Sequence, residues 1–200
     1  MASKDRILRL KEETRLNILE ASLQIVKEDG WQALSMRKIA DVIEYTAPII
    51  YEYFANKDAI LLELTRKGYL ILAKDLTEAR DKHAEAAKQL EAMWVAYWNF
   101  AFANKELYQG MFGLQTNCCC ELVNNLPESD LPYDLVSEVI GRIMHIDDLE
   151  SDEICTQYYT FWSVVHGLIS INLLSRGSSD EINRLVLNNA ITGIIRTING

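Results

Sequence analysis

The segment "SMRKIADVIEYTAPIIYEYFANKD", residues 35–58, mixes a helical apolar pattern with Arg, Lys, Thr and Tyr side chains. Its apolar residues need a core, whereas its hydroxyl, guanidinium and ammonium groups need a partner outside that core. These groups are hydrogen-bond donors, and the chain carries no nucleophile elbow, Walker loop, HExxH or Rossmann fingerprint that would turn them to catalysis. The chemistry indicated is binding rather than bond breaking.

Short helices must position these donors. Ser35 is a plausible N-cap of a helix of about nine residues, and a turn at Glu44-Tyr45 leads to Thr46, which caps a second short helix through Tyr53. A helix ending at Gly30 precedes them, and Asn56 caps a long helix that follows. The side chains predicted to form their shared core are Met36, Ile39, Ala40, Ile43, Ile50 and Phe54.

Two short helices joined by a tight turn within such a bundle form a helix-turn-helix. The first turns of both helices face outward, and their N–H groups and positive dipole ends favour phosphate oxygens. A short exposed helix also fits a DNA major groove, which is about 12 Å wide.

This segment resembles the tetracycline-repressor (TetR) family of bacterial transcription regulators. The resemblance runs from "RLNILEASLQIVKEDGWQALSMRKIA" through "IIYEYFANKDAILLEL". Its marks are an Ile-Leu-x-Ala first helix ending in Gly, a Leu-Ser-Met-Arg-x-Ile-Ala second helix, and Tyr-x-Tyr-Phe-x-Asn-Lys-Asp after the third. "FANKELYQGMFG" at 102–113 and "WSVVHG" at 162–167 are similar to the landmarks of a subtype named for a Trp-His-Gly signature.

The resemblance implies roles for individual residues. Arg37 is placed to reach a base edge or a phosphate, and Lys38 is interpreted as an ordinary solvated charge. Further DNA-contact positions open the recognition helix or grip the phosphate backbone: Ser35, Thr46, Ala47, Pro48, Tyr51, Tyr53 and Lys57. Because Tyr51 and Tyr53 are two residues apart on a helix, both cannot face one core.

Glu44 departs from the family pattern, which usually has Gly in the turn between the second and third helices. If this residue must adopt a positive φ, Glu would be strained there. A carboxylate facing DNA would also repel phosphate.

The C-terminal part is rich in large rings at helical spacing. Such stripes form either a core or the wall of an effector pocket, and the sequence leaves both interpretations open. The candidate pocket residues are Trp94, Tyr97, Trp98, Phe112, Trp162 and His166. For His166 a hydrogen-bonded core role is the competing interpretation.

No metal or cofactor site is predicted. Neighbouring helical residues point about 100° apart, so Cys118, Cys119 and Cys120 cannot converge on zinc without unwinding, although a redox role stays open. His83 and His145 show no metal spacing. An enzyme using His166 with a cysteine is disfavoured because no base with an orienting group can be identified.

The net charge of −9, taken alone, opposes nucleic-acid binding. Residues 1–57, however, hold nine basic and nine acidic residues, whereas the remainder holds eleven against twenty. The acidity therefore belongs to the C-terminal part. The uncharged run at 154–174 contains Gln157, His166 and Asn172 and lacks basic flanks, so we expect a core or interface helix rather than a membrane span. No signal peptide is visible, which predicts a cytoplasmic protein.

The expected fold is all-α with about nine helices: a helix-turn-helix DNA-binding domain at 1–57 and an effector-binding and dimerisation domain at 58–200. The resemblance implies a homodimeric regulator, a repressor more than an activator. It would bind double-stranded DNA at a palindromic operator, with recognition helices about 34–36 Å apart. The last two helices would form the dimer, and a small-molecule effector would shift the helix after Asn56. The alternative is a helical dimer that binds a small molecule or another regulator without DNA activity.

Overall fold

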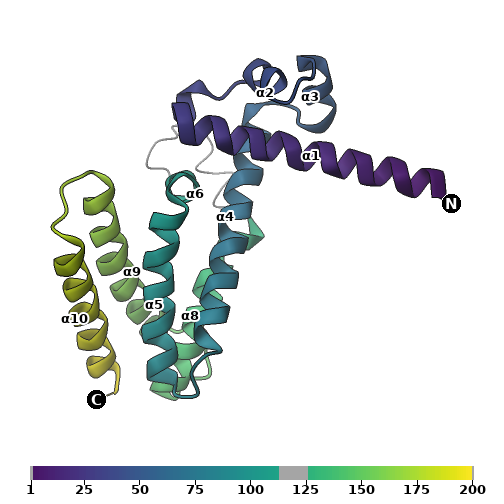
Figure 1. Ribbon diagram of the computed structural model, residues 1–200. Helices are drawn as coiled ribbons and strands as arrows, with labels where there is room; N and C mark the ends of the chain where they lie inside the picture. Colours follow the sequence, from purple (N-terminus) through teal and green to yellow (C-terminus); the bar gives the residue numbers. More distant parts are fainter. Residues whose placement is uncertain (1, 113–125, 200) are drawn as a thin grey trace. The chain divides into compact units, whose positions relative to one another are not determined.

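The structure, a computed structural model, describes residues 2–112 and 126–199 and is helical with no strand within those ranges. Nine α-helices and two short 3-10 helices occur in this described part, as the all-α prediction required (Figure 1). The chain divides into two compact units. The first contains α1, η1, α2, α3, the beginning of α4 through Gly68 and α6 from Glu106. The second contains the rest of α4, α5, η2, α8, α9 and α10.

In the first unit, α1 (Ala2–Asp29) and α4 (Lys57–Arg80) flank the short helices η1 (Trp31–Ala33), α2 (Met36–Val42) and α3 (Ala47–Tyr53). Their apolar residues meet in one core, as the helical spacing predicts. The fully or nearly fully buried side chains include Ile18, Ile25, Trp31, Leu34, Ile39, Ala40, Ile50, Phe54, Ile60 and Leu64. Ile43, predicted for this core, is half-buried because it is the C-cap of α2.

Side-chain caps set the boundaries of these helices. The Ser35 hydroxyl accepts a hydrogen bond from the Lys38 N–H at 3.2 Å, and the Asn56 carboxamide accepts one from the Ala59 N–H at 2.9 Å. Both predicted N-caps are therefore confirmed. The helix α2 is seven residues long, shorter than the nine expected, because its last predicted residues belong to the turn.

The turn between α2 and α3 has the hydrogen bonds of a Schellman motif. The Tyr45 N–H donates to the Ala40 carbonyl at 2.9 Å, and the Glu44 N–H donates to the Asp41 carbonyl at 3.4 Å. Glu44 sits at the left-handed position with φ 58°. The strain expected for a Glu at this point of the turn is therefore present.

The helix α6 (Lys105–Met111) packs closely on other parts of the first unit through two glycines. A Cβ on Gly110 would lie 3.0 Å from the Trp31 ring, and a Cβ on Gly68 would lie 2.6 Å from the Met111 sulfur. Trp31 itself is 4% exposed. Because Gly68 has no side chain, α4 can approach Met111 of α6 closely. Because Gly110 has none, α6 can pack against the Trp31 ring of η1.

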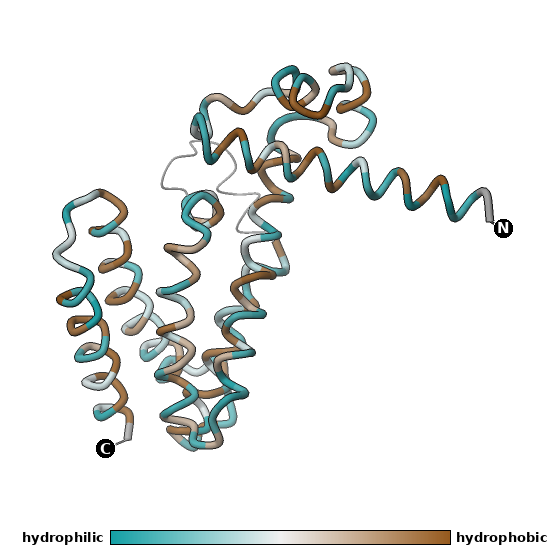
Figure 2. The backbone as a smooth tube through the Cα atoms, in the orientation of Figure 1, coloured by the Kyte–Doolittle hydropathy of each residue, from teal (hydrophilic) through white to brown (hydrophobic). Residues whose placement is uncertain are grey.

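The second unit is built from α5 (Ala86–Ala103), α8 (Leu131–Met144), α9 (Asp152–Leu173) and α10 (Asp180–Asn199), with the end of α4 and η2 (Pro127–Ser129). Apolar residues recur along these helices at core spacing (Figure 2). Their buried side chains include Leu72, Leu76, Leu90, Met93, Phe100, Val139, Ile140, Ile154, Val165, Ile169, Leu187 and Ile191.

Local rules decide where two helices of this unit begin. The helix α8 begins at Leu131, and Pro132 is tolerated in its first turn because the missing N–H has no helical partner there. The N-cap of α10 is Ser179, whose hydroxyl accepts a hydrogen bond from the Ile182 N–H at 3.4 Å.

A pair of asparagine side chains, Asn183 buried and Asn172 half-buried, joins α9 to α10. The Asn183 Nδ2 donates to the Asn172 Oδ1 at 2.6 Å and to the Ser178 carbonyl at 3.1 Å, and Asn183 is 4% exposed. Because an unpaired amide would cost about 1–3 kcal/mol when buried, the pair fixes the register of this antiparallel hairpin. No helix within the described ranges is long and apolar enough to cross a membrane.

Candidate nucleic-acid interface

The beginning of α3 faces outward from the first unit. Thr46 is the N-cap of α3 and is exposed, although its hydroxyl makes no capping hydrogen bond. Pro48 is exposed in the first turn, and Ala47 beside it is half-buried. Because the first-turn N–H groups of a helix have no helical acceptor, this end of α3 offers donors and a partial positive charge to a ligand.

Arg37 and Lys38 are adjacent in α2 but have different surroundings. The Lys38 ammonium lies 2.7 Å from the Asp29 carboxylate, so its charge is already paired within the chain. Arg37 is exposed and forms no ion pair with any described residue. Its guanidinium, a planar fork of five N–H donors, is available for a phosphate or a guanine edge.

The two tyrosines of α3 separate as their spacing requires. Tyr51 is 55% exposed, and its hydroxyl makes no hydrogen bond within the described part of the chain. Tyr53 is half-buried. An exposed aromatic ring carrying a free donor, one helical turn after Ala47, suits contact with a nucleic-acid backbone.

Lys57 has a structural contact as well as an outward position. Its ammonium donates to the Trp31 carbonyl at 3.1 Å and is half-buried. This bond ties the start of α4 to η1, so the contribution of Lys57 to any interface includes positioning the helices behind it. Two of its three N–H donors remain after this bond.

The second unit holds five of the six candidate pocket residues. Trp94 and Tyr97 are 2% and 3% exposed, and the Trp162 Nε1 donates to the Tyr97 hydroxyl at 3.0 Å. His166 lies beside Trp162, with ring centroids 5.0 Å apart, and burial lowers the pKa of His166. The structure thus brings these four residues of α5 and α9 together.

The other two candidates lie elsewhere. Trp98 is half-buried and packs against Phe102, with ring centroids 4.6 Å apart. Phe112 belongs to the first unit, where it packs against Tyr108 at 4.8 Å. The three neighbouring cysteines, Cys118 to Cys120, lie outside the described residues.

Several members of the aromatic cluster were missed by sequence reasoning. Phe161 stacks on Trp94 with centroids 5.3 Å apart, and Tyr158 lies 6.0 Å from the same ring. Burial raises the pKa of Tyr158, and burial with the Asp130 charge raises the pKa of Tyr69 to about 12. The three-residue spacing of Tyr158 and Phe161 on α9 was the available signal.

The Trp94 indole also carries an unsatisfied donor. Its Nε1 is buried, and none of the described residues accepts a hydrogen bond from it. A buried polar group without a partner is uncommon in a protein interior. The Trp31 Nε1 and the Ser137 hydroxyl likewise have no partner among the described residues.

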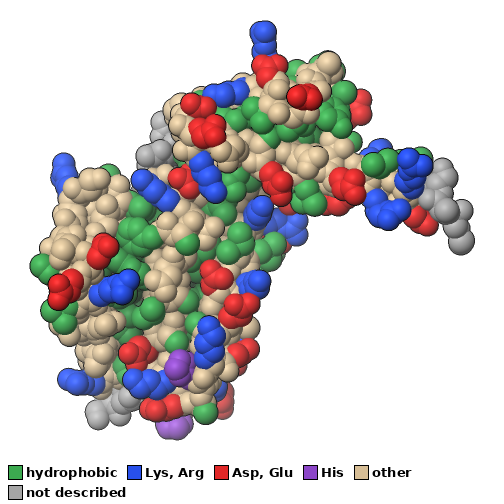
Figure 3. Space-filling view, viewed as in Figure 1, with side chains coloured by type: hydrophobic (Ala, Val, Ile, Leu, Met, Phe, Trp, Pro, Cys, Tyr) green, Lys and Arg blue, Asp and Glu red, His purple; other side chains and the backbone are tan. Residues whose placement is uncertain are grey.

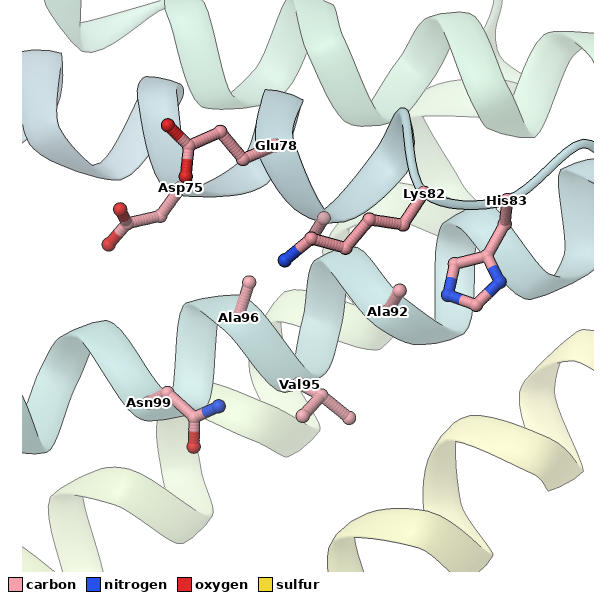
Figure 4. A pocket seen from close by; sticks show the side chains of 9 residues that line it. Asp75, Glu78, Lys82, His83, Ala92, Val95, Ala96 and Asn99 are labelled. Atoms are coloured by element: carbon pink, nitrogen blue, oxygen red, sulfur yellow. The ribbon is translucent and has the colours of Figure 1, made fainter.

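A groove of about 360 Å³ lies between α4 and α5 of the second unit (Figure 4). The small side chains of Ala92 and Ala96 line the α5 side of the groove, while Asp75, Glu78 and Lys82 border the α4 side. Burial, followed by the Glu78 charge, raises the pKa of Asp75. The groove is open and carries both signs of charge, and sequence reasoning did not find it because its walls come from separate helices.

The fold and the exposed α2–α3 surface define a class, the helix-turn-helix DNA-binding regulators. Two family models match the chain: "Bacterial regulatory proteins, tetR family" over residues 18–64 and "Tetracyclin repressor-like, C-terminal domain" over residues 90–182. Together they span more than half of the sequence. The chain belongs to the TetR family of bacterial regulatory proteins.

Individual relatives agree with this assignment. An uncharacterized HTH-type transcriptional regulator from Haemophilus influenzae is 27% identical over 94 residues, which are 47% of this chain and 50% of that protein. The match thus spans half of that relative. The Trp-His-Gly subtype suggested by the C-terminal residues stays a prediction.

Solved structures share the fold. A protein of unknown function from Rhodococcus sp. RHA1 is 20% identical and has a TM-score of 0.78, covering 93% of this chain and 95% of its own. FadR from Bacillus subtilis, solved in complex with stearoyl-CoA, is 16% identical with a TM-score of 0.71, covering 89% and 98% respectively.

Proposed function

We propose that this regulator is a homodimeric repressor whose affinity for a palindromic operator is controlled by a small-molecule effector. The observation that carries the proposal is the outward surface of α2 and α3, where Arg37, Pro48 and Tyr51 are exposed and the Arg37 charge is unpaired within the described chain. A surface of this kind offers guanidinium, apolar and hydroxyl contacts in one major groove.

Fluorescence anisotropy with a labelled duplex from the DNA upstream of the protein's own gene tests the DNA part. Arg37→Ala should weaken operator binding about 10- to 100-fold, because an Arg–guanine pair contributes ~1–3 kcal/mol of discrimination. Tyr51→Ala should weaken binding to operator and unrelated duplexes alike, because a backbone contact carries no sequence information.

Lys38→Ala is the matched control, since Lys38 neighbours Arg37 but its charge is held by Asp29. It should change operator affinity much less than Arg37→Ala. Lys57 is less suitable because its removal also breaks the bond to the Trp31 carbonyl. Equal binding of wild-type protein to operator and scrambled duplexes would overturn the proposal and favour a dimeric binding protein without DNA activity.

Dimerisation through α9 and α10 is supported by their outward faces. Exposed large apolar residues on these two helices are Tyr159, Val164, Ile171, Leu174, Ile182, Leu185 and Val186. A hollow of about 790 Å³ runs along α9 from Asp152 to Val164. No atom of the described residues lies within 4 Å of a Cβ built on Gly167 or on Gly193.

Glycines inside helices cost about 1 kcal/mol relative to Ala, and neither of these has a packing reason within the subunit. Close approach of a second copy supplies that reason, and it would also cover the apolar residues around them. Such an arrangement is a four-helix bundle across the two-fold axis.

Effector control is supported by the aromatic cluster around Trp94, whose buried Nε1 lacks an acceptor among the described residues. The fold shared with FadR in complex with stearoyl-CoA suggests a long-chain acyl-CoA as the first compound to test. Stearoyl-CoA added to the protein–operator complex should lower the anisotropy. For an almost complete release, the effector must prefer the DNA-free state by about 10⁴-fold.

Native mass spectrometry of the protein purified from its host gives an independent result. A dimer carrying a co-purified compound would identify the effector by mass. If stearoyl-CoA leaves the complex intact and no compound co-purifies, effector control is overturned while the DNA-binding proposal stands.

A further inference from the structure

The first part of α1 extends beyond the packed domain. The helix has 28 residues, yet the first buried side chain is that of Ile18, and residues 4–13 are all exposed. At about 1.5 Å per residue, residues 2–13 form a helical extension roughly 18 Å long, which we call the arm. Figure 1 shows α1 passing α2 and α3 and continuing beyond them to its free end.

The arm is basic. It carries Lys4, Arg6, Arg9 and Lys11, while its carboxylates are Asp5, Glu12 and Glu13. None of its four cations forms an ion pair with a described residue. Blue basic side chains gather at the free end of α1 in Figure 3. Residues 2–11 hold these four cations against Asp5 alone, so this end of α1 is net positive on a chain whose net charge is −9.

Arg15 shows where the packed part of α1 begins. Its guanidinium lies 3.0 Å from the Glu63 carboxylate and 5.1 Å from the centroid of the Phe54 ring. This cation is already used within the first unit, one turn before Ile18. The cations of the arm, by contrast, have no such partner in the part of the chain that the structure describes, and they are available to a ligand.

The arm belongs to the same compact unit as α2 and α3. It therefore shares that unit with the exposed side chains of Arg37, Thr46 and Tyr51. A free helical segment of about a dozen residues is marginal in water, so contact with a partner surface would stabilise it.

B-DNA is the partner whose chemistry fits this charge. A duplex carries one negative charge per about 1.7 Å of axis, so an arm roughly 18 Å long faces several phosphates. Lys4 and Lys11 lie on one side of the helix and Arg6 and Arg9 on the other. Because the helix is about 10–12 Å wide and charges interact over about 8 Å at physiological salt, both pairs attract the same backbone.

We propose that the arm lies along the phosphate backbone of the duplex that flanks the bases contacted by α3, and that it adds affinity without adding sequence preference. The proposal rests on the DNA binding proposed above. A second copy of the arm is a poorer partner, although Ile7, Leu8 and Leu10 are exposed, because the four cations of each copy would repel those of the other.

The test is the full-length variant Lys4→Gln/Arg6→Gln/Arg9→Gln/Lys11→Gln, with the dissociation constant measured for operator and scrambled duplexes between 50 and 300 mM salt. Gln has nearly the helix propensity of Lys and Arg, so α1 should be retained. The slope of log K against log salt should fall by about two per subunit, since each neutralised phosphate contributes about 0.9.

Both dissociation constants should rise in parallel, about tenfold or more at 0.15 M salt, and their ratio should stay constant because phosphate contacts do not discriminate sequences. This separates the arm from Arg37, whose loss should lower the ratio. The control is Lys74→Gln/Lys82→Gln/Lys88→Gln/Lys105→Gln, which removes the same charge from exposed positions outside the arm and should leave the slope within experimental error of wild type.

Three results would overturn the inference. An unchanged salt slope would remove the arm from the interface while the wild type still binds operator. The same slope reduction in the control variant would assign the effect to net charge. With DNA binding unchanged, loss of dimerisation by the arm variant would assign the arm to a second copy of the chain. With DNA binding unchanged, loss of binding to phosphatidylserine vesicles would assign it to a lipid surface. A wild type that binds no duplex defeats the DNA-binding proposal itself.

Discussion

Two outward faces of this chain can be compared, one on each unit. The α2–α3 face of the first unit exposes hydrogen-bonding groups, including Arg37 and Thr46, and the same unit carries the basic arm. The α9–α10 face of the second unit exposes Leu174, Leu185 and other apolar side chains, with open glycines among them. Neither face is covered within the described chain.

The difference shows that the residues of each face indicate its partner, whereas the composition and net charge of the whole chain do not. A net charge of −9 and roughly half apolar residues describe neither surface. Donors without partners suit a polyanion, and apolar surface beside missing side chains suits a closely packed protein helix. One chain can therefore hold a DNA face and a self-associating face at once.

The largest expected effect is on the apolar face. Leu185→Asp places a carboxylate at a residue that is 59% exposed in the subunit and that we propose is covered in the dimer. The subunit should remain folded, because an exposed residue tolerates a charge. The dimer should weaken at least 100-fold, since the effective penalty for burying an unpaired ion is several kcal/mol. Sedimentation velocity measures both properties.

Leu16→Asp provides the comparison, because Leu16 is 47% exposed on α1 and lies outside the arm. It should leave the dimer intact. If Leu185→Asp also leaves the dimer intact, the two faces do not differ as proposed, and α10 is an ordinary solvated surface.

Sequence reasoning predicted the helices well where local rules decide them. The caps at Ser35 and Asn56, and the all-α fold, follow from side chains within a few residues of each other. The sequence raised a positive φ at Glu44 only as a condition, and the structure shows that Glu44 does adopt it. The helix α2 is shorter than predicted because its last expected residues form the turn that Glu44 closes, and the apolar spacing alone does not show where the turn begins.

Features that depend on tertiary contacts were out of reach of the sequence. The bond between Lys57 and the Trp31 carbonyl spans 26 positions, and the pairing of Lys38 with Asp29 distinguishes it from Arg37 only in space. The fit of Gly110 against Trp31 likewise has no local signature. Whether a cation is free or used, which decides the candidate site, is a property of the folded chain.

A smaller and more specific effect is expected at Gly167, in the interior of α9. In the monomeric Leu185→Asp background, Gly167→Ala should raise the free energy of unfolding by about 0.5–1 kcal/mol, because Ala favours the helix and the added Cβ meets nothing. In the wild-type background the same substitution should weaken the dimer, because the Cβ would enter the space between two closely packed helices.

The opposite signs are the informative outcome. Urea unfolding of the monomeric variant and sedimentation of the dimer measure them separately. A dimer that is tightened by Gly167→Ala would mean that no partner approaches this face closely, even if Leu185 is covered.

The smallest effect is expected at a backbone feature that both units contain, a non-glycine residue with a positive φ at the end of a helix. Glu44 ends α2 with φ 58° and His145 ends α8 with φ 57°, and in both cases the following N–H donates to a carbonyl five residues earlier. A side chain in this conformation costs about 1–2 kcal/mol. Glycine removes that cost but also loosens the unfolded chain, by about 0.4–1 kcal/mol, so Glu44→Gly and His145→Gly should each stabilise the fold by roughly 0.5–1 kcal/mol.

Only one of these substitutions should change DNA binding. Glu44 is exposed two residues before the N-cap Thr46, so its carboxylate opposes an approaching phosphate, and Glu44→Gly should tighten operator binding about threefold at low salt. His145→Gly should leave that affinity unchanged. Thermal unfolding and anisotropy on both variants make the comparison. Equal stabilisation with equal DNA affinity would show that Glu44 does not face the duplex, so the orientation proposed for α2 and α3 would have to be revised.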